Sequence, residues 1–289
     1  MHIFITGGSG YIGRPTIKAL RAAGHEVTAL ARSEKSEILV RELGAIPVAG
    51  GLGDTDVLRE AAAAADAVIH LGADASVNMG EADRIAAAAL QDGIAGRPYV
   101  HTGGLWVYGD TGGIATEESP YRAPAITAWR EANERAVLDR ANAGGHPVLV
   151  MPALVFGHRQ GLLHQLFAAP AAKTGAVPYI GDGTNHVTLV HVDDIARLYV
   201  LALGAAAGSV YAGANGEFLT FGELARALSL GVGLDGKTVS LSFEQAREKW
   251  GVFADAFALD QCVSSDKARR ELGWEPVYGS ALATLSRGQ

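Results

Sequence analysis

The sequence is poor in cysteine, in positive charge and in long apolar segments, and each of these shortages excludes a class of protein. Among its 289 residues there is one cysteine, Cys262, so an intramolecular disulfide and a cysteine-based metal site are excluded. With 24 Lys and Arg against 31 Asp and Glu, the net charge of −7 disfavours a nucleic-acid or anionic-membrane surface. No apolar run approaches the roughly 18 residues of a membrane span, and nothing at the N-terminus resembles a signal peptide. We therefore expect a cytoplasmic protein without a metal, acting on a small-molecule substrate.

What the sequence does contain is a regular alternation of short apolar runs and helical patterns over its first 150 residues. The strand-like runs cover 2–6, 26–31, 45–49, 66–72, 97–102 and 146–152. Apolar strands that alternate with helices are typical of βαβ units and of a parallel sheet covered on both faces. The sequence therefore predicts an α/β protein with a Rossmann-type doubly wound parallel sheet.

After Pro152 this alternation changes. A helix is expected around 161–173, a strand and then a helix over 187–203 with Asp193 as N-cap, and further helices at 221–230, 243–250 and 265–272. No linker divides the chain. We expect one domain over 1–289, with the dinucleotide-binding core at about 1–156. Residues from about 157 to 289 should complete the core and form a small C-terminal lobe on the substrate side.

The segment "FITGGSGYIGRP" (4–15) carries the strongest functional signal. Gly8, Gly10 and Gly13 form a Gly-x-Gly-x-x-Gly pattern that follows a strand and opens a helix. Glycines permit a tight turn and let the backbone approach a pyrophosphate, whose charge suits the helix N-terminus. An ordinary glycine-rich turn is the alternative, but its place in a series of βα units favours a dinucleotide site.

The end of the second strand indicates which dinucleotide is bound. NAD-binding proteins carry an acidic residue about 20 residues after the glycine loop, where it bonds the ribose hydroxyls. This chain has Arg32 there, followed by Ser33, and Arg14 lies just after the last glycine. A guanidinium binds a 2′-phosphate that a carboxylate would repel, so the sequence favours NADP(H). The alternative is that Arg32 is an exposed loop residue.

Several separated motifs then agree with one family. The chain resembles the extended short-chain dehydrogenase/reductases, in their NAD(P)-dependent epimerase/dehydratase-like branch. The resemblance rests on the glycine loop and on "DAVIHLGA" (66–73), "VHTGGLWVYG" (100–109), "MPALVFG" (151–157), "GDGTNHVTLVHVDDIA" (181–196) and "SSDKARRELGWEP" (264–276).

The resemblance implies a set of cofactor contacts. Those to the pyrophosphate and its loop fall on Gly7, Ser9, Gly10, Tyr11, Ile12 and Gly13. Those to the adenosine and the inner ribose fall on Arg32, Ser33, Leu52, Leu71, Gly72 and Ala73. The nicotinamide side falls on Pro152, Ala153, Leu154 and Val155. The same resemblance gives "VHVDDIA" a mainly structural role.

The family's catalytic residues are missing. The resemblance implies a Ser or Thr at the end of the fifth strand and a Tyr-x-x-x-Lys motif on the next helix. Gly104 stands at the Ser position, and Ile126 and Arg130 stand at the Tyr and Lys positions within "ITAWREANE". A register on Trp129 and Asn133 supplies no tyrosine either. Isoleucine cannot transfer a proton, and arginine remains protonated.

The candidate catalytic residues are therefore Thr102, Arg130 and Tyr108. Thr102 follows a strand end where ligands bind in open α/β sheets, Arg130 can stabilise an oxyanion, and Tyr108 can also be a packing residue. The leading hypothesis is an NADP(H)-dependent oxidoreductase acting on a small carbonyl or alcohol. The alternatives are a non-catalytic NADP(H)-sensing regulator and a non-redox isomerase or cyclase. The oligomeric state stays open between monomer and homodimer.

Overall fold

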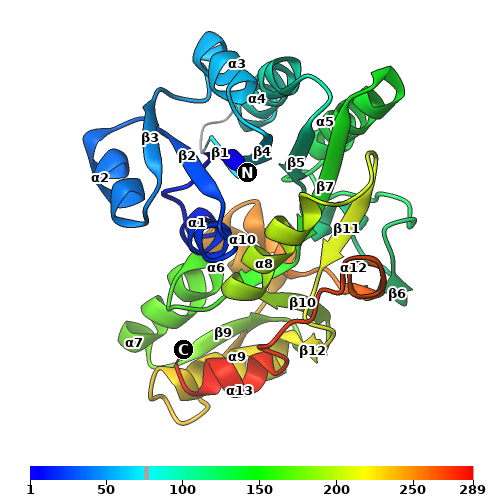
Figure 1. Ribbon diagram of the computed structural model, residues 1–289. Helices are drawn as coiled ribbons and strands as arrows, with labels where there is room; N and C mark the ends of the chain where they lie inside the picture. Colours follow the sequence, from blue (N-terminus) through cyan, green and yellow to red (C-terminus); the bar gives the residue numbers. More distant parts are fainter. Residues whose placement is uncertain (75–77, 289) are drawn as a thin grey trace. The chain divides into compact units, whose positions relative to one another are not determined.

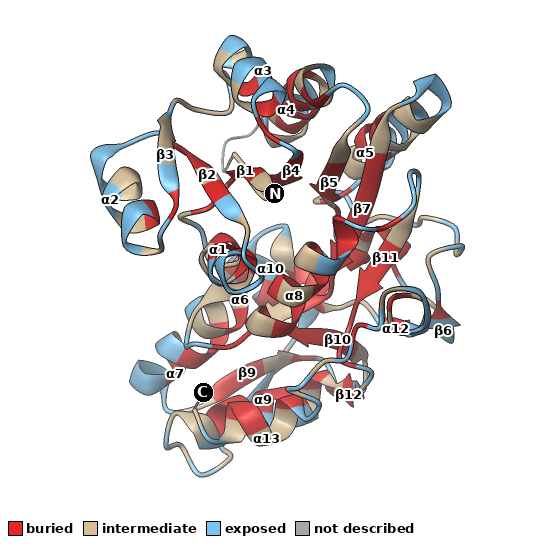
Figure 2. Ribbon diagram, viewed as in Figure 1, coloured by how far each residue is buried: buried red, intermediate tan, exposed pale blue. Residues whose placement is uncertain are grey.

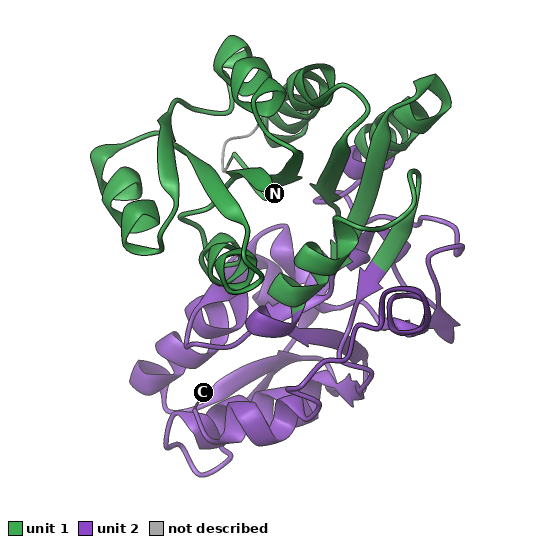
Figure 3. Ribbon diagram, in the orientation of Figure 1, with its two compact units in different colours: residues 1–103, 132–151, 195–211 green, residues 104–131, 152–194, 212–289 purple. Residues whose placement is uncertain are grey.

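The computed structural model describes residues 1–74 and 78–288 and divides the chain into two compact units (Figure 3). The first unit comprises residues 1–103, 132–151 and 195–211, and the second comprises 104–131, 152–194 and 212–289. The division of the chain near residue 156 and its behaviour as a single domain stay predictions.

The first unit is built on a parallel sheet (Figure 1). Its strands are β1 (His2–Thr6), β2 (Glu26–Ala31), β3 (Ile46–Ala49), β4 (Ala67–His70), β5 (Pro98–Thr102), β7 (His146–Pro152) and β11 (Val210–Gly213). They lie in the order β11-β7-β5-β4-β1-β2-β3, and the pairs from β7 to β3 are parallel. The chain winds outward from β1 in both directions, so the predicted doubly wound Rossmann-type sheet is confirmed.

Apolar strands and amphipathic helices explain this architecture. Ile3, Phe4 and Ile5 of β1 are fully buried, as are Val68 and Ile69 of β4; Figure 2 shows the buried central strands and the exposed outer faces of the helices. The helices are α1 (Gly13–Ala22), α2 (Glu34–Glu42), α3 (Thr55–Ala63), α4 (Met79–Ile94), α5 (Trp129–Asp139) and α8 (Val192–Ala202). Continuous burial of strands on both faces is what a parallel sheet covered by helices requires.

The second unit has its own apolar core, in which Phe167, Phe221, Trp250 and Phe257 pack ring against ring. Its strands are β6 (Ile114–Ala115), β8 (Leu154–Phe156), β9 (Val177–Ile180), β10 (His186–His191), β12 (Phe218–Thr220), β13 (Thr238–Leu241) and β14 (Cys262–Val263). Its helices are a 3-10 turn (Leu105–Tyr108), α6 (Gly161–Leu163), a π-helical segment (His164–Ala168), α7 (Ala169–Thr174), α9 (Phe221–Gly231), α10 (Phe243–Trp250), α11 (Phe253–Phe257), α12 (Asp266–Leu272) and α13 (Ala281–Ser286). Within the described residues, no helix is long and apolar enough to cross a membrane.

Two local expectations differ from the structure. The helix expected across "ITAWREANE" begins only at Trp129, because the chain turns after Pro124 and the Thr127 amide donates to the Pro124 carbonyl at 2.9 Å. Asp193 is not the N-cap of α8. Since β10 ends at His191 and α8 begins at Val192, Asp193 lies inside the first helical turn.

Candidate functional site

A cavity of about 530 Å³ lies in the first unit, beside the glycine loop that follows β1 and the chain that follows β4. This is the point where the strand order reverses and where ligands bind in open α/β sheets. The cavity is lined by Gly7, Ser9, Gly10, Leu30, Arg32, Ser36, Gly50, Gly51, Leu52, Gly53, Leu71, Gly72, Ala73, Asp74 and Ala82. Eight of these were predicted as cofactor contacts: Gly7, Ser9, Gly10, Arg32, Leu52, Leu71, Gly72 and Ala73.

The glycines give the cavity its shape. Gly7 has a φ of +70°, and a Cβ on it would lie 2.6 Å from the Leu71 carbonyl carbon. A Cβ on Gly13 would lie 2.1 Å from the Gly7 oxygen, so α1 can approach the loop only through a glycine. The N-terminus of α1 therefore faces the loop closely, as binding of a dinucleotide pyrophosphate requires.

The predicted residues at the adenosine side separate into two groups. Arg32 is exposed and lines the cavity. Ser33 instead caps α2: its hydroxyl accepts from the Ser36 amide at 3.3 Å, and the Ser36 hydroxyl donates back to the Ser33 carbonyl at 2.7 Å. Ser36, which the sequence did not single out, also lines the cavity, and its hydroxyl is held by the capping box with Ser33.

The remaining predicted residues of the glycine loop lie outside the cavity lining. Tyr11 and Ile12 form the turn that leads into α1, and Gly13 is the first helical residue. Arg14, considered as a second partner for a 2′-phosphate, donates from Nε to the Gly10 carbonyl at 3.3 Å.

A buried polar network contacts the cavity lining through Gly72. The Gly72 amide donates to Thr6 Oγ1 at 3.0 Å, and Thr6 Oγ1 lies 2.6 Å from His70 Nδ1. His70 Nε2 faces Asp83 Oδ1 at 3.5 Å, and His101 Nε2 faces Asp83 Oδ2 at 3.7 Å. The carboxylate of Asp83 thus connects two histidines of neighbouring strands to a residue of the cofactor cavity.

Two hydroxyl groups contact the histidines of this network. The Tyr99 hydroxyl lies 2.8 Å from His101 Nδ1, and burial together with the Asp83 charge raises the pKa of Tyr99 well above its ordinary value. Tyr99 therefore keeps its proton and can donate it to His101 Nδ1, as Thr6 can to His70 Nδ1, and in that tautomer both Nε2–H groups are directed toward Asp83. Protonated nitrogens have no lone pair for a metal. Although the donor atoms of His70, Asp83 and His101 lie within 4.8 Å of one another, this arrangement favours a hydrogen-bonded network.

Asp83 is ionised in this environment. Burial alone would raise the pKa of its carboxyl group, but the hydrogen bond to His70, the electrostatic attraction of His101 and His70, and the Asn133 amide hold it well below its ordinary value. Asn133 Nδ2 donates to Asp83 Oδ2 at 3.0 Å and to the Gly80 carbonyl at 2.7 Å. A buried carboxylate that accepts from an amide and faces two imidazole nitrogens is favoured in its charged form.

At the end of β5, Thr102 is committed to the sheet. Its hydroxyl donates to the His70 carbonyl at 2.7 Å and accepts from the Tyr199 hydroxyl at 2.9 Å. Its single proton is used, so toward a ligand it can act only as an acceptor. The next residue is Gly103. A side chain there would collide with Glu134, because a Cβ on Gly103 would lie only 2.8 Å from Glu134 Oε1. The buried Glu134 carboxyl therefore fills the space beside the strand end, and sequence reasoning did not assign it a role.

The other candidates lie in the second unit. Arg130 Cζ stacks 4.5 Å above the Trp129 ring, and its Nε lies 3.9 Å from the position of a Cβ on Gly104. The positions matched to the family's lysine and serine are therefore adjacent. Ile126 is half-buried in the preceding turn. Tyr108 is 2% exposed and packs edge to face on Tyr121, with 5.3 Å between ring centroids.

The residues predicted for the nicotinamide side also belong to the second unit. Pro152 ends β7, and Leu154 and Val155 pair in parallel with Leu189 and Val190 of β10. The Ala153 amide donates to the Gly213 carbonyl at 2.9 Å. These contacts place 152–155 in sheet structure, and their role toward a cofactor stays a prediction.

The glycine cradle at the reversal point of a parallel sheet defines a dinucleotide-binding protein. The chain belongs to the NAD dependent epimerase/dehydratase family, whose family model matches residues 3–212. The predicted family is thereby confirmed, and a nicotinamide cofactor is supported.

The chain is also similar to individual proteins over nearly its whole length. An uncharacterized protein of Schizosaccharomyces pombe is 32% identical, with 99% of this chain and 98% of the relative covered. A 2-alkyl-3-oxoalkanoate reductase of Stenotrophomonas maltophilia is 31% identical, with 96% and 95% covered. A dTDP-glucose 4,6-dehydratase of Streptomyces venezuelae, whose crystal structure contains NAD, is 24% identical. The match covers 100% of this chain and 95% of the dehydratase, with a TM-score of 0.80. The last likeness shows the fold alone.

Proposed function

We propose that the protein is an NADP(H)-dependent oxidoreductase that interconverts a small carbonyl compound and its alcohol. The observation that carries this proposal is the glycine-cradled cavity of about 530 Å³, which has Arg32 at its lining. Gly7, Ser9 and Gly10 would hold the pyrophosphate, and Arg32 and Ser36 would hold the 2′-phosphate. Since one relative reduces 2-alkyl-3-oxoalkanoates, a ketone carbonyl is the first substrate class to test.

The chemistry must proceed without the family's tyrosine. When bound, the cofactor supplies a hydride to the carbonyl carbon. The oxygen that becomes negative needs positive charge and hydrogen-bond donors, which the Arg130 guanidinium offers while it remains protonated. We assign the proton to water, because Arg130 cannot release one and the Thr102 proton is donated to the His70 carbonyl. Thr102 Oγ1 can accept one hydrogen bond from a substrate hydroxyl.

Turnover is tested by mixing the purified protein with NADPH and a series of 3-oxo acids, 3-oxo esters, aldehydes and enones. The expected result is loss of the NADPH absorbance with at least one ketone. Tight NADPH binding with no turnover across the series would contradict the oxidoreductase proposal and support the regulator. Conversion of a substrate without net NADPH consumption would support the isomerase or cyclase.

Arg130→Ala is expected to lower kcat by about 100-fold, because it removes a donor to the developing oxyanion. Arg130→Lys should keep part of the rate through its charge. Arg140→Ala is the matched control, since Arg140 forms a surface ion pair with Asp92 at 2.8 Å. Full activity in Arg130→Ala, measured at saturating ketone, would remove Arg130 from the mechanism.

Arg32→Ala is expected to weaken NADPH binding by about 1.5–3 kcal/mol and to leave NADH binding nearly unchanged, because only NADPH carries the 2′-phosphate. Titration calorimetry with both cofactors measures the difference. Arg41→Ala is the control, because Arg41 pairs with Glu37 on the exposed face of α2. An equal loss for both cofactors would contradict the assignment of NADP(H).

A further inference from the structure

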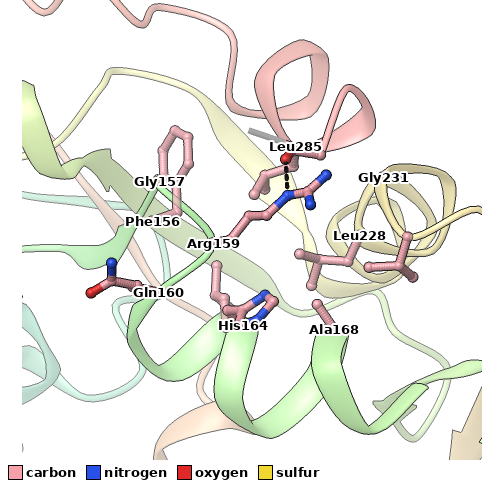
Figure 4. A pocket seen from close by; sticks show the side chains of 12 residues that line it. Phe156, Gly157, Arg159, Gln160, His164, Ala168, Leu228, Gly231 and Leu285 are labelled. Atoms are coloured by element: carbon pink, nitrogen blue, oxygen red, sulfur yellow. Dashed lines mark hydrogen bonds between the residues drawn. The ribbon is translucent and has the colours of Figure 1, made fainter. Parts of the chain in front are cut away.

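A second cavity, of about 410 Å³, lies entirely within the second unit (Figure 4). Its polar lining includes Arg159 and His164, which Figure 4 shows reaching into the same space. The apolar lining includes Phe156, Leu163, Ala168, Leu228, Val232 and Leu285. A concave space of this size, mostly apolar and with a few convergent polar groups, is typical of a small-molecule site.

The backbone that carries Arg159 is strained. His158 and Arg159 have φ angles of 55° and 53°, in the left-handed region that non-glycine residues rarely adopt. The preceding Gly157 has a φ of +119°, and a Cβ there would lie 2.4 Å from His191 Nε2. Strain of this kind persists only where the surroundings fix it, and it is concentrated at functional sites.

Two contacts hold this strained segment in place. His158 Nε2 lies 3.0 Å from each carboxylate oxygen of Asp193. The His158 ring also packs edge to face on the buried His191 ring, with centroids 5.4 Å apart, and His191 in turn stacks on Tyr278. The loop is thus anchored on its far side, and the anchoring fixes the direction in which the next side chain, Arg159, leaves the backbone.

The Arg159 side chain is oriented by one hydrogen bond. Its Nε donates to the Gly288 carbonyl at 2.6 Å, and a guanidinium has five N–H groups in a planar fork. Within residues 1–74 and 78–288, its remaining N–H groups form no hydrogen bond or ion pair. A positive fork beside apolar walls matches a carboxylate that carries a hydrocarbon chain, because the fork binds both oxygens while the chain displaces water.

We propose that this cavity binds a short-chain alkanoate, with its carboxylate on Arg159 and His164 and its chain against Leu163, Leu228 and Leu285. An inorganic anion such as phosphate would leave the apolar lining exposed to water. An alcohol of the same length would leave the guanidinium without a counter-charge. The site is independent of the proposed redox reaction and shares no residue with the cofactor cavity.

The test uses the full chain and sodium hexanoate, with 1-hexanol and sodium phosphate as matched probes, in titration calorimetry. Hexanoate is expected to bind, with an affinity at least about tenfold higher than that of either probe. Arg159→Gln should weaken hexanoate binding about tenfold or more, and Arg159→Lys should fall between it and the wild type. Arg247→Gln, which removes an exposed arginine paired with Asp255 at 2.7 Å, should bind like the wild type.

A second variant tests the apolar part of the site and guards against misfolding of the first. Val232→Phe places a ring in the cavity from a half-buried position, leaves Arg159 intact, and is expected to abolish hexanoate binding while the melting temperature is retained. No hexanoate binding to the wild-type protein, equal binding of phosphate, or unchanged binding to a folded Arg159→Gln variant would each overturn the proposal. None of these measurements depends on turnover or on NADPH.

Discussion

Replacing Asp83 by alanine is expected to lower the free energy of unfolding by about 3 kcal/mol. The Asp83 carboxylate faces His70 and His101 and accepts from Asn133 in an environment where these side chains are almost completely buried. Its removal takes the acceptor from one buried Asn133 N–H and removes the negative charge that faces two buried imidazole nitrogens at 3.5 and 3.7 Å. Each buried donor that loses its partner costs about 1–3 kcal/mol, and the cavity left by the side chain adds to this cost.

Urea denaturation of the wild-type and variant proteins measures this effect. Asp92→Ala is a matched control, because Asp92 lies on the same helix α4 and forms only an exposed ion pair with Arg140. Its loss should cost less than about 1 kcal/mol. A loss of similar size in both variants would contradict the importance assigned to the buried network.

The same network connects stability to cofactor binding. Through His70 and Thr6, Asp83 supports the Gly72 amide, which belongs to the cavity lining. Asp83→Asn keeps the volume of the side chain but presents N–H groups to an imidazole N–H. We expect it to weaken NADPH binding as well as folding, whereas Asp92→Ala should leave NADPH binding unchanged.

The fold was predictable because it depends on patterns of many residues. The six strands expected over the first 150 residues are present with bounds within two residues of those predicted, since each is a continuous apolar run covered on both faces. Strands β6, β8, β9, β12, β13 and β14 were not predicted individually. They are two to four residues long, and runs of this length do not produce a distinctive periodicity.

Site residues were predictable only where the backbone geometry permits a single residue type. Gly7 and Gly13 are required by close backbone approach, and the glycine pattern showed it. Asp83 was not found, because a single acidic residue in an Ala-rich helix looks like an exposed one. Its partners lie 13 and 18 residues away, at His70 and His101, and come together only when β4 and β5 pair. Glu134 was missed for the same reason, since its proximity to Gly103 depends on how α5 packs.

Gly13→Ala is expected to be more damaging than any other glycine-to-alanine change in the loop that lines the cofactor cavity. The new Cβ would lie 2.1 Å from the Gly7 oxygen and 2.7 Å from the Gly8 Cα. Both atoms are backbone, so α1 must move away from the loop. Such overpacking costs about 1–3 kcal/mol of stability or more. Because the displaced helix N-terminus is the proposed anion site, NADPH affinity should also fall by at least about tenfold.

Gly113→Ala provides the control for this prediction. Nothing lies within 4 Å of the position of its Cβ, and its φ is not in the left-handed region. Alanine there should leave both the melting temperature and the NADPH affinity close to those of the wild type. The melting temperature could rise slightly, because alanine lowers the conformational entropy of the unfolded chain. If Gly13→Ala retained wild-type affinity for NADPH, a tight approach of α1 to the glycine loop would not be needed for binding. In that case the pyrophosphate contacts would have to be assigned to other backbone amides of the cavity, with those of 50–53 and 71–73 the next to test.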